Sequence, residues 1–249
     1  MSAPQQTEAI VLSHIDVGEE DRIVTFLTRD HGLLRAAAGG AKRLRGGRPA
    51  VFDLFVHGII HFHVSGKEGK LTRIRSAEVI HPFLNIRADY GRLCAASYLA
   101  EVTAHCVQEA DPVPSIFDLI LFCMGQLESG AEVYRILFLY VMRLLKELGM
   151  APELSHCMVC RGPIEGEALL SPMDGGAVHP ACARSAGVQV LQAGDMAFLA
   201  FAAKRRIESL SNLKPDPESA ERLFQALHTF AVHHLGFEPR SFKMLGKGT

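Results

Sequence analysis

Hydrophobic and polar residues alternate along the first eighty positions with the period of two that predicts β-strands. The clearest alternation covers residues 52–64. One face of this run carries Phe52, Leu54, Val56, Ile60, Phe62 and Val64, and the other carries Asp53, His57, His61 and His63, mixed with Phe55 and Ile59. Gly58 in the middle predicts a bulge or a sharp bend. Similar patterns predict further strands at residues 8–17, 22–27, 33–38 and 71–80. Five short, strongly bent strands indicate a compact Greek-key barrel of the OB type.

From Pro82 onward the hydrophobic positions follow helical spacing. Steps of four residues predict one buried helix face, made of Cys94, Tyr98, Val102 and Cys106. Further helices are expected at residues 115–127, 132–148, 194–209 and 217–235. The last has the clearest boundaries: Asp216 fits an N-cap, Pro217 the first helical position and Gly236 the stop.

Charge is distributed unevenly along the 249 residues, although the formal net charge is only −1. Residues 31–80 hold nine Lys or Arg and three acidic residues, a local net charge of +6, so the rest of the chain carries −7. This asymmetry predicts a basic binding module on a mildly acidic body.

The densest group of cations lies in residues 39–48, a segment that also contains two pairs of glycines. It consists of Lys42, Arg43, Arg45 and Arg48. Glycines let the backbone approach a polyanion closely, and the cations would neutralise phosphates and release counterions. The segment falls between predicted strands, where OB barrels place the loops that border a nucleic-acid groove. We therefore expect nucleic-acid binding here; the alternative is a solvated loop without a partner.

Neighbouring strands could extend this basic surface through Arg35, Arg73 and Arg75, of which the last two share a strand face. Phe26 and Phe55 are candidates to stack on bases, although most phenylalanines of a small barrel belong to its core. Two other polar groups favour simpler interpretations. His57, His61 and His63 fit the polar face of a strand better than a metal site, and residues 204–206 (Lys-Arg-Arg) fit a solvated helix face that could also grip an acidic peptide.

A second chemical signal is the pair of motifs Cys157-Met-Val-Cys160 and His179-Pro-Ala-Cys182, joined by an eighteen-residue connector. Two-residue gaps let one tight turn point two side chains at the same ion, and the connector is rich in turn-forming Gly and Pro. Four ligands without a vacant position predict a structural Zn²⁺ site. His156 is an alternative fourth ligand, and three free or buried cysteines beside a turn histidine are the alternative to a metal site.

These patterns predict an α+β chain of three parts. An OB barrel covers residues 1–80, a helical bundle covers 81–153 and 186–249, and a zinc knuckle inserted in the bundle covers 154–185. Cysteine usage fits a reducing cytoplasm, and neither a signal peptide nor a membrane span is expected. Because phosphate-loop, nucleophile-elbow, zinc-protease and dinucleotide motifs are all missing from the sequence, we do not expect an enzyme.

The order of barrel, Gly-Ala-Lys-Arg loop (residues 39–48), helices and Cys-x-x-Cys…His-x-x-Cys, closed by residues 234–241 (His-Leu-Gly-Phe-Glu-Pro-Arg-Ser), resembles the RecO family over essentially the whole chain. The resemblance implies a bacterial recombination mediator in DNA repair that binds single- and double-stranded DNA and anneals complementary strands. It also implies that the protein works with RecR to load RecA onto DNA coated by single-strand-binding protein, whose acidic C-terminal tail it contacts.

By the same resemblance, Lys42, Arg43, Arg45 and Arg48 match the family's DNA-contacting loop, and Cys157, Cys160 and Cys182 match its zinc cysteines. This sequence has His179 where the family pattern has a fourth cysteine, and histidine is also a good zinc ligand. Two other functions remain open at this stage: an RNA-binding factor built on the same barrel, and an adaptor whose zinc knuckle docks a protein.

Overall fold

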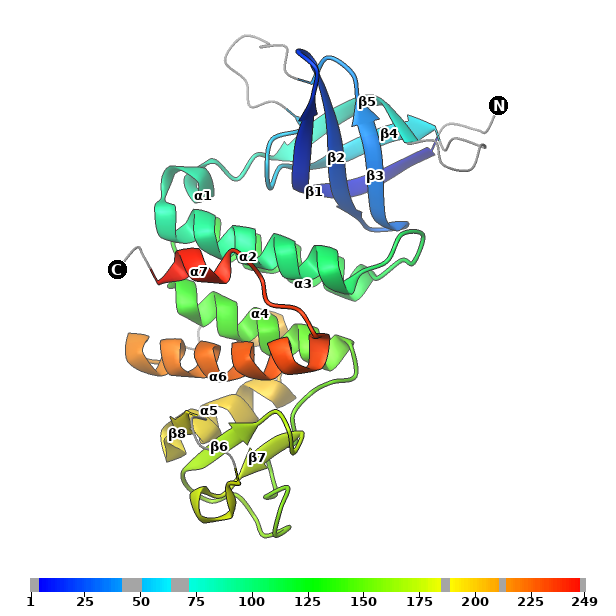
Figure 1. Ribbon diagram of the computed structural model, residues 1–249. Helices are drawn as coiled ribbons and strands as arrows, with labels where there is room; N and C mark the ends of the chain where they lie inside the picture. Colours follow the sequence, from blue (N-terminus) through cyan, green and yellow to red (C-terminus); the bar gives the residue numbers. More distant parts are fainter. Residues whose placement is uncertain (1–4, 42–50, 64–71, 185–188, 211–213, 247–249) are drawn as a thin grey trace. The chain divides into compact units, whose positions relative to one another are not determined.

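The computed structural model describes residues 5–41, 51–63, 72–184, 189–210 and 214–246 (Figure 1). The chain forms two compact units, one of Met1–Glu128 with Pro239–Thr249 and one of Ser129–Glu238. The three-part organisation expected from the sequence, with boundaries near residues 80, 154 and 185, remains a prediction. Among the described helices, none is both long and apolar enough to cross a membrane.

The first unit begins with a closed five-stranded barrel, which confirms the expected fold class. Its strands are β1 (Gln5–Val17), β2 (Asp21–Thr28), β3 (Gly32–Ala38), β4 (His57–His63) and β5 (Thr72–His81). They follow the order β1-β2-β3-β5-β4, and β4 closes the barrel by pairing with β1. Strand β1 is long and bent, so that its first half pairs with β4 and its second half with β2 (Figure 1). All neighbours are antiparallel except β3 and β5, which run parallel.

Alternating residues of these strands fill the barrel interior, as the period of two requires. The buried cluster includes Val11, Val24, Phe26, Ala36, Ile60 and Phe62. Gly58 lies where the pairing of β4 with β5 changes register, in agreement with the bulge or bend expected there. A Cβ at this position would collide with the carbonyl oxygen of Glu78, so only glycine fits.

The strand expected at residues 52–64 is shorter than predicted, because residues 52–56 form turns before β4. Phe55 has a positive φ of 69°, and its N–H donates to the carbonyl of Val11 at 2.9 Å, while Val11 N–H donates to the Val56 carbonyl. Val11 still pairs with Phe26 of β2, and the pairing of β1 with β2 changes register directly after it, between Val11 and Ser13. Both Phe55 and His57 are buried, contrary to their expected place on a polar face.

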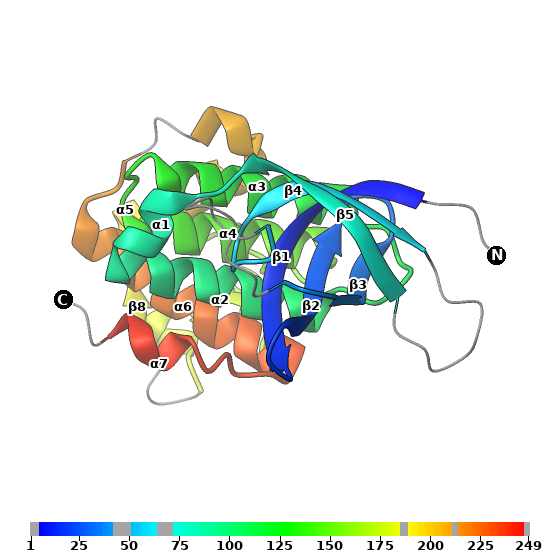
Figure 2. The same ribbon diagram turned by 90° about the horizontal axis from the view of Figure 1, so that it is seen from above.

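The rest of the first unit is helical, with α1 (Leu84–Ala88), α2 (Tyr90–Cys106), α3 (Pro114–Glu128) and α7 (Phe242–Leu245). The buried face of α2 contains Cys94, Tyr98 and Val102, as the spacing of four predicted. Helix α7 lies beside α2, which both Figure 1 and Figure 2 show. The Glu101 carboxylate of α2 holds it there by accepting from the N–H groups of Arg240 and Ser241 and from the Ser241 hydroxyl.

The second unit packs α4 (Val133–Glu147) against α6 (Pro217–Leu235) and adds α5 (Ala193–Lys204). Helix α6 has the predicted limits: the Asp216 carboxylate accepts from Ser219 N–H, and Gly236 ends the helix with a φ of +62°. The helix expected at 194–209 ends at Lys204 instead, because the backbone is extended at Arg205 before a short 3₁₀ helix at Ile207–Leu210.

A small antiparallel sheet completes this unit, formed by β6 (Ala168–Ser171), β7 (Gly176–Val178) and β8 (Val190–Leu191) in the order β7-β6-β8. Strands β6 and β7 form the short hairpin expected between the two Cys/His motifs.

Candidate metal centre and nucleic-acid interface

The first Cys/His motif is a tight turn from Cys157 to Gly162. The N–H of Cys157 donates to the Gly162 carbonyl at 2.8 Å, and Arg161 N–H donates back to the Cys157 carbonyl at 2.9 Å. Arg161 has a positive φ of 64°, which closes the turn. Met158 N–H donates to the Ala177 carbonyl and thereby fixes the turn to β7. The turn directs the sulfurs of both cysteines to the same side.

The second motif begins where β7 ends. His179 is followed by a 3₁₀ helix at Pro180–Cys182, in which Cys182 N–H donates to the His179 carbonyl at 2.9 Å. The N–H of His179 lies 3.4 Å from the Cys157 sulfur, so the backbone itself joins the two motifs. The hairpin of β6 and β7 therefore brings together residues that are nineteen positions apart in the sequence.

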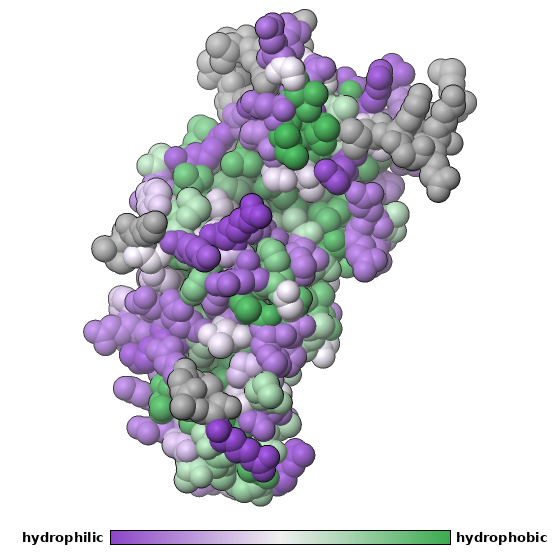
Figure 3. Space-filling model, in the orientation of Figure 1, coloured by the Kyte–Doolittle hydropathy of each residue, from purple (hydrophilic) through white to green (hydrophobic). Residues whose placement is uncertain are grey.

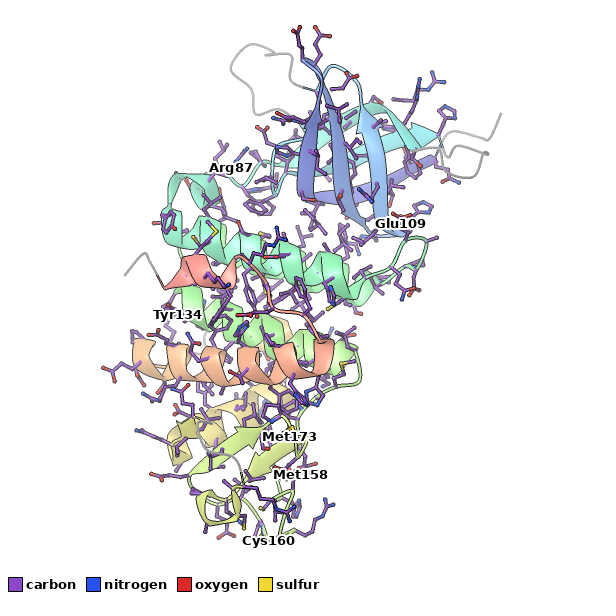
Figure 4. All side chains as sticks on the ribbon, in the orientation of Figure 1. Arg87, Glu109, Tyr134, Met158, Cys160 and Met173 are labelled. Atoms are coloured by element: carbon purple, nitrogen blue, oxygen red, sulfur yellow. The ribbon has the colours of Figure 1, made fainter. Side chains whose placement is uncertain are left out.

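Four potential ligand atoms converge, from Cys157, Cys160, His179 and Cys182, and all lie within 4.8 Å of one another. The Nδ1 atom of His179 lies 3.3 Å from the Cys160 sulfur and 4.0 Å from the Cys182 sulfur. Tetrahedral zinc with ordinary Zn–S and Zn–N lengths separates such atoms by about 3.6 Å. The cluster, in which Figure 4 labels Cys160, therefore has the dimensions of a four-coordinate metal site. His156 is not a member of it.

A hydrogen bond outside the cluster fixes the orientation of the histidine ring. His179 Nε2 lies 2.9 Å from the Pro163 carbonyl oxygen, which can only accept, so Nε2 carries the proton and Nδ1 offers its lone pair. Metal-binding histidines are commonly held by such a second partner. Sequence reasoning did not identify Pro163 in this role, because its carbonyl is brought to the ring by the fold of the connector.

The environment of Cys157 favours its thiolate. Burial opposes ionisation, but the N–H groups of Cys160, His179 and Val159 point at the sulfur and lower the pKa of the Cys157 thiol to about 6. The thiolate is the form that binds metals. Leu169 and Val178 cover the same sulfur in a small buried cluster. All four ligand positions come from the protein, so the arrangement suits a structural ion and leaves no position for a substrate.

The second candidate site is a face of the barrel. Lys42, Arg43, Arg45 and Arg48 lie outside the described residues, but Arg35, Arg73 and Arg75 are described, and all three are exposed. Ala37 of β3 lies opposite Arg73 of β5, and Arg35 is two positions before Ala37, so these arginines share the outer face of neighbouring strands. Strand β3 ends at Ala38, directly after the residue opposite Arg73, and residues 42–48 follow in the sequence.

These three arginines differ from others of the same unit, which are held in ion pairs. The pairs join Arg22 to Asp16 and Asp53, Arg29 to Glu8 and Asp118, and Arg87 to Asp53. With the other described residues, Arg35, Arg73 and Arg75 form no ion pair. Their charges therefore face solvent, where a polyanion would find them.

Of the residues that the sequence suggested as possible sites on the barrel, Phe26, Phe55 and His57 are buried and do not lie on this face. Phe26 and Phe55 are each 1% exposed, and Phe26 belongs to the cluster inside the barrel, so neither ring is accessible to stack on bases. His57 is buried against Phe117 of α3, with ring centroids 6.1 Å apart. His61 and His63 lie on the outer side of β4, where His63 is opposite Arg73, and the described residues there hold no group with metal-site geometry.

Together, these features define a class of protein: an OB-type barrel with an open basic face, joined in one chain to a helical unit that carries a four-ligand Cys/His cluster. Two family models match this chain. The one described as Recombination protein O N terminal covers residues 1–83, and the one described as Recombination protein O C terminal covers residues 87–242. The chain belongs to the RecO family of DNA repair proteins.

Individual relatives agree with this assignment. The chain is 25% identical over 240 residues to the DNA repair protein RecO of Myxococcus xanthus, which covers 96% of both chains. It is 32% identical over 247 residues to that of a Roseiflexus species, covering 96% of this chain and 84% of the relative. The RecO protein of Bacillus subtilis is 34% identical over 175 residues, 70% of this chain and 67% of the relative.

Proposed function

We propose that this protein is a non-catalytic, DNA-binding recombination mediator. It binds single- and double-stranded DNA on the outer face of the barrel, anneals complementary strands, and with RecR loads RecA onto DNA coated by single-strand-binding protein. The observation that carries the proposal is the solvent-facing set of Arg35, Arg73 and Arg75 on neighbouring strands β3 and β5. The basic residues 42–48, which follow β3 in the sequence, support it. Membership of a DNA repair family supports the same role.

The proposed mechanism is electrostatic. Cationic side chains displace the counterions of a DNA backbone, so binding depends steeply on salt and little on sequence. If one barrel holds two backbones, the cations between them reduce their mutual repulsion. Complementary bases can then meet and pair without any bond being made or broken by the protein.

We further propose that Cys157, Cys160, His179 and Cys182 hold a structural Zn²⁺. Bound there, zinc would cross-link the two motifs through thiolate and imidazole ligands and would supply no catalytic chemistry. The ligand distances, the low pKa of the Cys157 thiol and the hydrogen bond from His179 to Pro163 support this choice of ion. Cys3His is a common zinc ligand set.

The DNA-binding surface is tested by reversing charges in the segment 42–48. We expect Lys42→Glu with Arg43→Glu to abolish most binding of a fluorescein-labelled oligonucleotide in an anisotropy titration at moderate salt, because two phosphate contacts become repulsive. The matched control is Lys204→Glu with Arg205→Glu, an equal charge change in the second unit. Unchanged affinity of the first variant, with a native circular dichroism spectrum, would refute the assignment of the segment.

A separate surface fits the acidic tail of single-strand-binding protein. At the end of α5, Lys204 and Arg205 are exposed, and the Arg205 guanidinium lies 4.9 Å from the ring of the half-exposed Phe201. Cations on an exposed surface attract an acidic peptide, and the neighbouring aromatic ring adds apolar contact area. Lys204→Glu with Arg205→Glu should weaken binding of such a peptide at least tenfold in calorimetry, while Lys42→Glu with Arg43→Glu should leave it unchanged. The reverse pattern would contradict this placement.

A further surface suits a protein partner such as RecR. Ile15 and Val17 are 60% and 45% exposed at the end of β1, and Figure 3 shows hydrophobic side chains gathered on the barrel over the β1–β2 hairpin. Exposed apolar patches of this kind mark contact sites on proteins. The two competing functions remain distinguishable: a protein-only adaptor would show no steeply salt-dependent binding of nucleic acid, and an RNA-binding factor would prefer RNA to DNA of equal length.

A further inference from the structure

The three sulfurs of the Cys/His cluster have different surroundings. Cys157 is fully buried, and three backbone N–H groups point at its sulfur. Cys182 is half-buried, and Cys160 is exposed. A solute that reaches this unit therefore meets the Cys160 sulfur first, while Cys157 is both covered and stabilised by hydrogen bonds.

The two accessible sulfurs are also close enough to combine. Both lie beside His179 Nδ1, at 3.3 Å for Cys160 and 4.0 Å for Cys182, and the whole ligand set lies within 4.8 Å. A disulfide requires a sulfur separation of about 2.05 Å, so the sulfurs need to approach by at most about 2.8 Å. Cys160 is in the first turn and Cys182 in the second, so a bond between them would join the two motifs directly.

We propose that the cluster is an oxidation site, at which hydroperoxides convert Cys160 and Cys182 to a disulfide and release the metal. The inference rests on the proposed occupation of the cluster by zinc. It assigns to these cysteines a reaction with a small oxidant, in addition to a structural role.

The reaction balances in two steps. The Cys160 thiolate attacks one oxygen of hydrogen peroxide, the O–O bond breaks, and the hydroxide that leaves takes a proton to become water, which gives the sulfenic acid of Cys160. The Cys182 thiolate then attacks this sulfur, the S–O bond breaks, and a second hydroxide leaves as water after protonation. Two thiolates lose two electrons in total, and the peroxide gains them.

Oxidation would remove two of the four ligands and leave only Cys157 and His179. Metal affinity falls when ligands are lost, and a region that depends on its metal loosens with it. The hydrophobic cluster around Cys157 is small, with only Leu169 and Val178 as its other fully buried members among the described residues. The proposed DNA-binding arginines belong to the other unit, so the oxidised protein should keep its affinity for DNA.

The test treats the full-length, zinc-loaded protein with millimolar hydrogen peroxide and follows zinc with a metallochromic indicator. We expect release of one zinc ion per chain, and peptide mapping should identify a Cys160–Cys182 disulfide as the first product. Dithiothreitol with added zinc should restore the metal. The control Cys106→Ser removes a half-buried thiol outside the cluster and should release zinc at the same rate.

Two results would overturn the inference. One is retention of zinc at peroxide concentrations that already oxidise Cys106; the other is a first product that contains Cys157 or a Cys160 sulfinic acid. Metal analysis of the untreated protein distinguishes failure of the oxidation hypothesis from failure of the proposed zinc site. A protein purified without zinc contradicts both, whereas zinc that peroxide cannot release contradicts only the oxidation site.

Discussion

At the scale of single residues, backbone geometry constrains the barrel more than side-chain chemistry does. Gly58 is the clearest case, because the carbonyl of Glu78 occupies the place where a Cβ would lie. The sequence indicated a special backbone at this position, since glycine is uncommon inside strands. It did not indicate Phe55, whose positive φ depends on a hydrogen bond to Val11, more than forty positions earlier.

Because the backbone at Gly58 leaves no room for a Cβ, even the methyl group of alanine should destabilise the folded protein. We expect Gly58→Ala to lower the free energy of unfolding by about 2 kcal/mol or more, the range found when a buried site is overpacked. Urea denaturation followed by circular dichroism measures this. The control is Gly125→Ala in α3, where an added Cβ meets nothing within 4 Å. This variant should be as stable as the wild type or slightly more stable. Equal stability of the two variants would contradict the close approach.

Residue-level reasoning succeeded where the signal is local. The grouping of Cys157, Cys160, His179 and Cys182 follows from spacings of two residues and a turn-rich connector, and the structure places the four ligand atoms together. It failed for His57, which looks polar in the sequence but is buried beside Phe117 of a helix sixty positions later. Burial by a distant element leaves no pattern near the residue itself.

At the scale of elements, helices with strong end signals were predictable to within a residue or two. Helix α6 shows why: a capping Asp216, a proline at the first position and a left-handed Gly236 act within one turn of the helix ends. The short helices α1 and α7 have no such pattern. Helix α7 depends instead on hydrogen bonds to Glu101, about 140 positions earlier. Elements that are fixed by distant contacts escape prediction from the sequence.

Helix α6 also contains a pH-sensitive residue. His228 is 5% exposed, and burial lowers its pKa from 6.5 to about 4, so the folded protein favours the neutral ring. The unfolded chain takes up a proton at higher pH than the folded one. Stability should therefore be unaffected by His228 above pH 6.5 and fall as the pH drops from about 6.5 to about 4, by on the order of 3 kcal/mol.

Urea unfolding between pH 4 and 8 tests this prediction by comparing wild type with His228→Gln. The difference in unfolding free energy between the two proteins should change with pH in the acidic half of this range. There, only the wild type has a ring at position 228 that takes up a proton on unfolding. The control His233→Gln, an exposed histidine of the same helix, should follow the wild type. Parallel curves for wild type and His228→Gln would show that the ring is not buried in its neutral form.

At the scale of the whole molecule, DNA binding and metal binding are assigned to different compact units. The exposed arginines belong to the unit that includes Met1–Glu128, and the Cys/His cluster belongs to Ser129–Glu238. The fold class and the family could be predicted from the sequence, because the order of barrel, basic segment, helices and Cys/His motifs spans the chain. The proposed DNA-binding surface could be predicted only as a concentration of charge. Which arginines are already paired with acids became visible only in the folded barrel.

This separation gives the most direct test of the account, which is the rate at which the protein anneals two complementary oligonucleotides. We predict that Arg35→Glu combined with Arg73→Glu and Arg75→Glu will abolish the acceleration. Removal of zinc by a chelator from the wild-type protein should leave most of it, provided that circular dichroism shows an intact barrel. Annealing that survives the charge reversals, or that disappears with the metal while the barrel stays folded, would contradict the proposal that the outer face of the barrel pairs DNA strands.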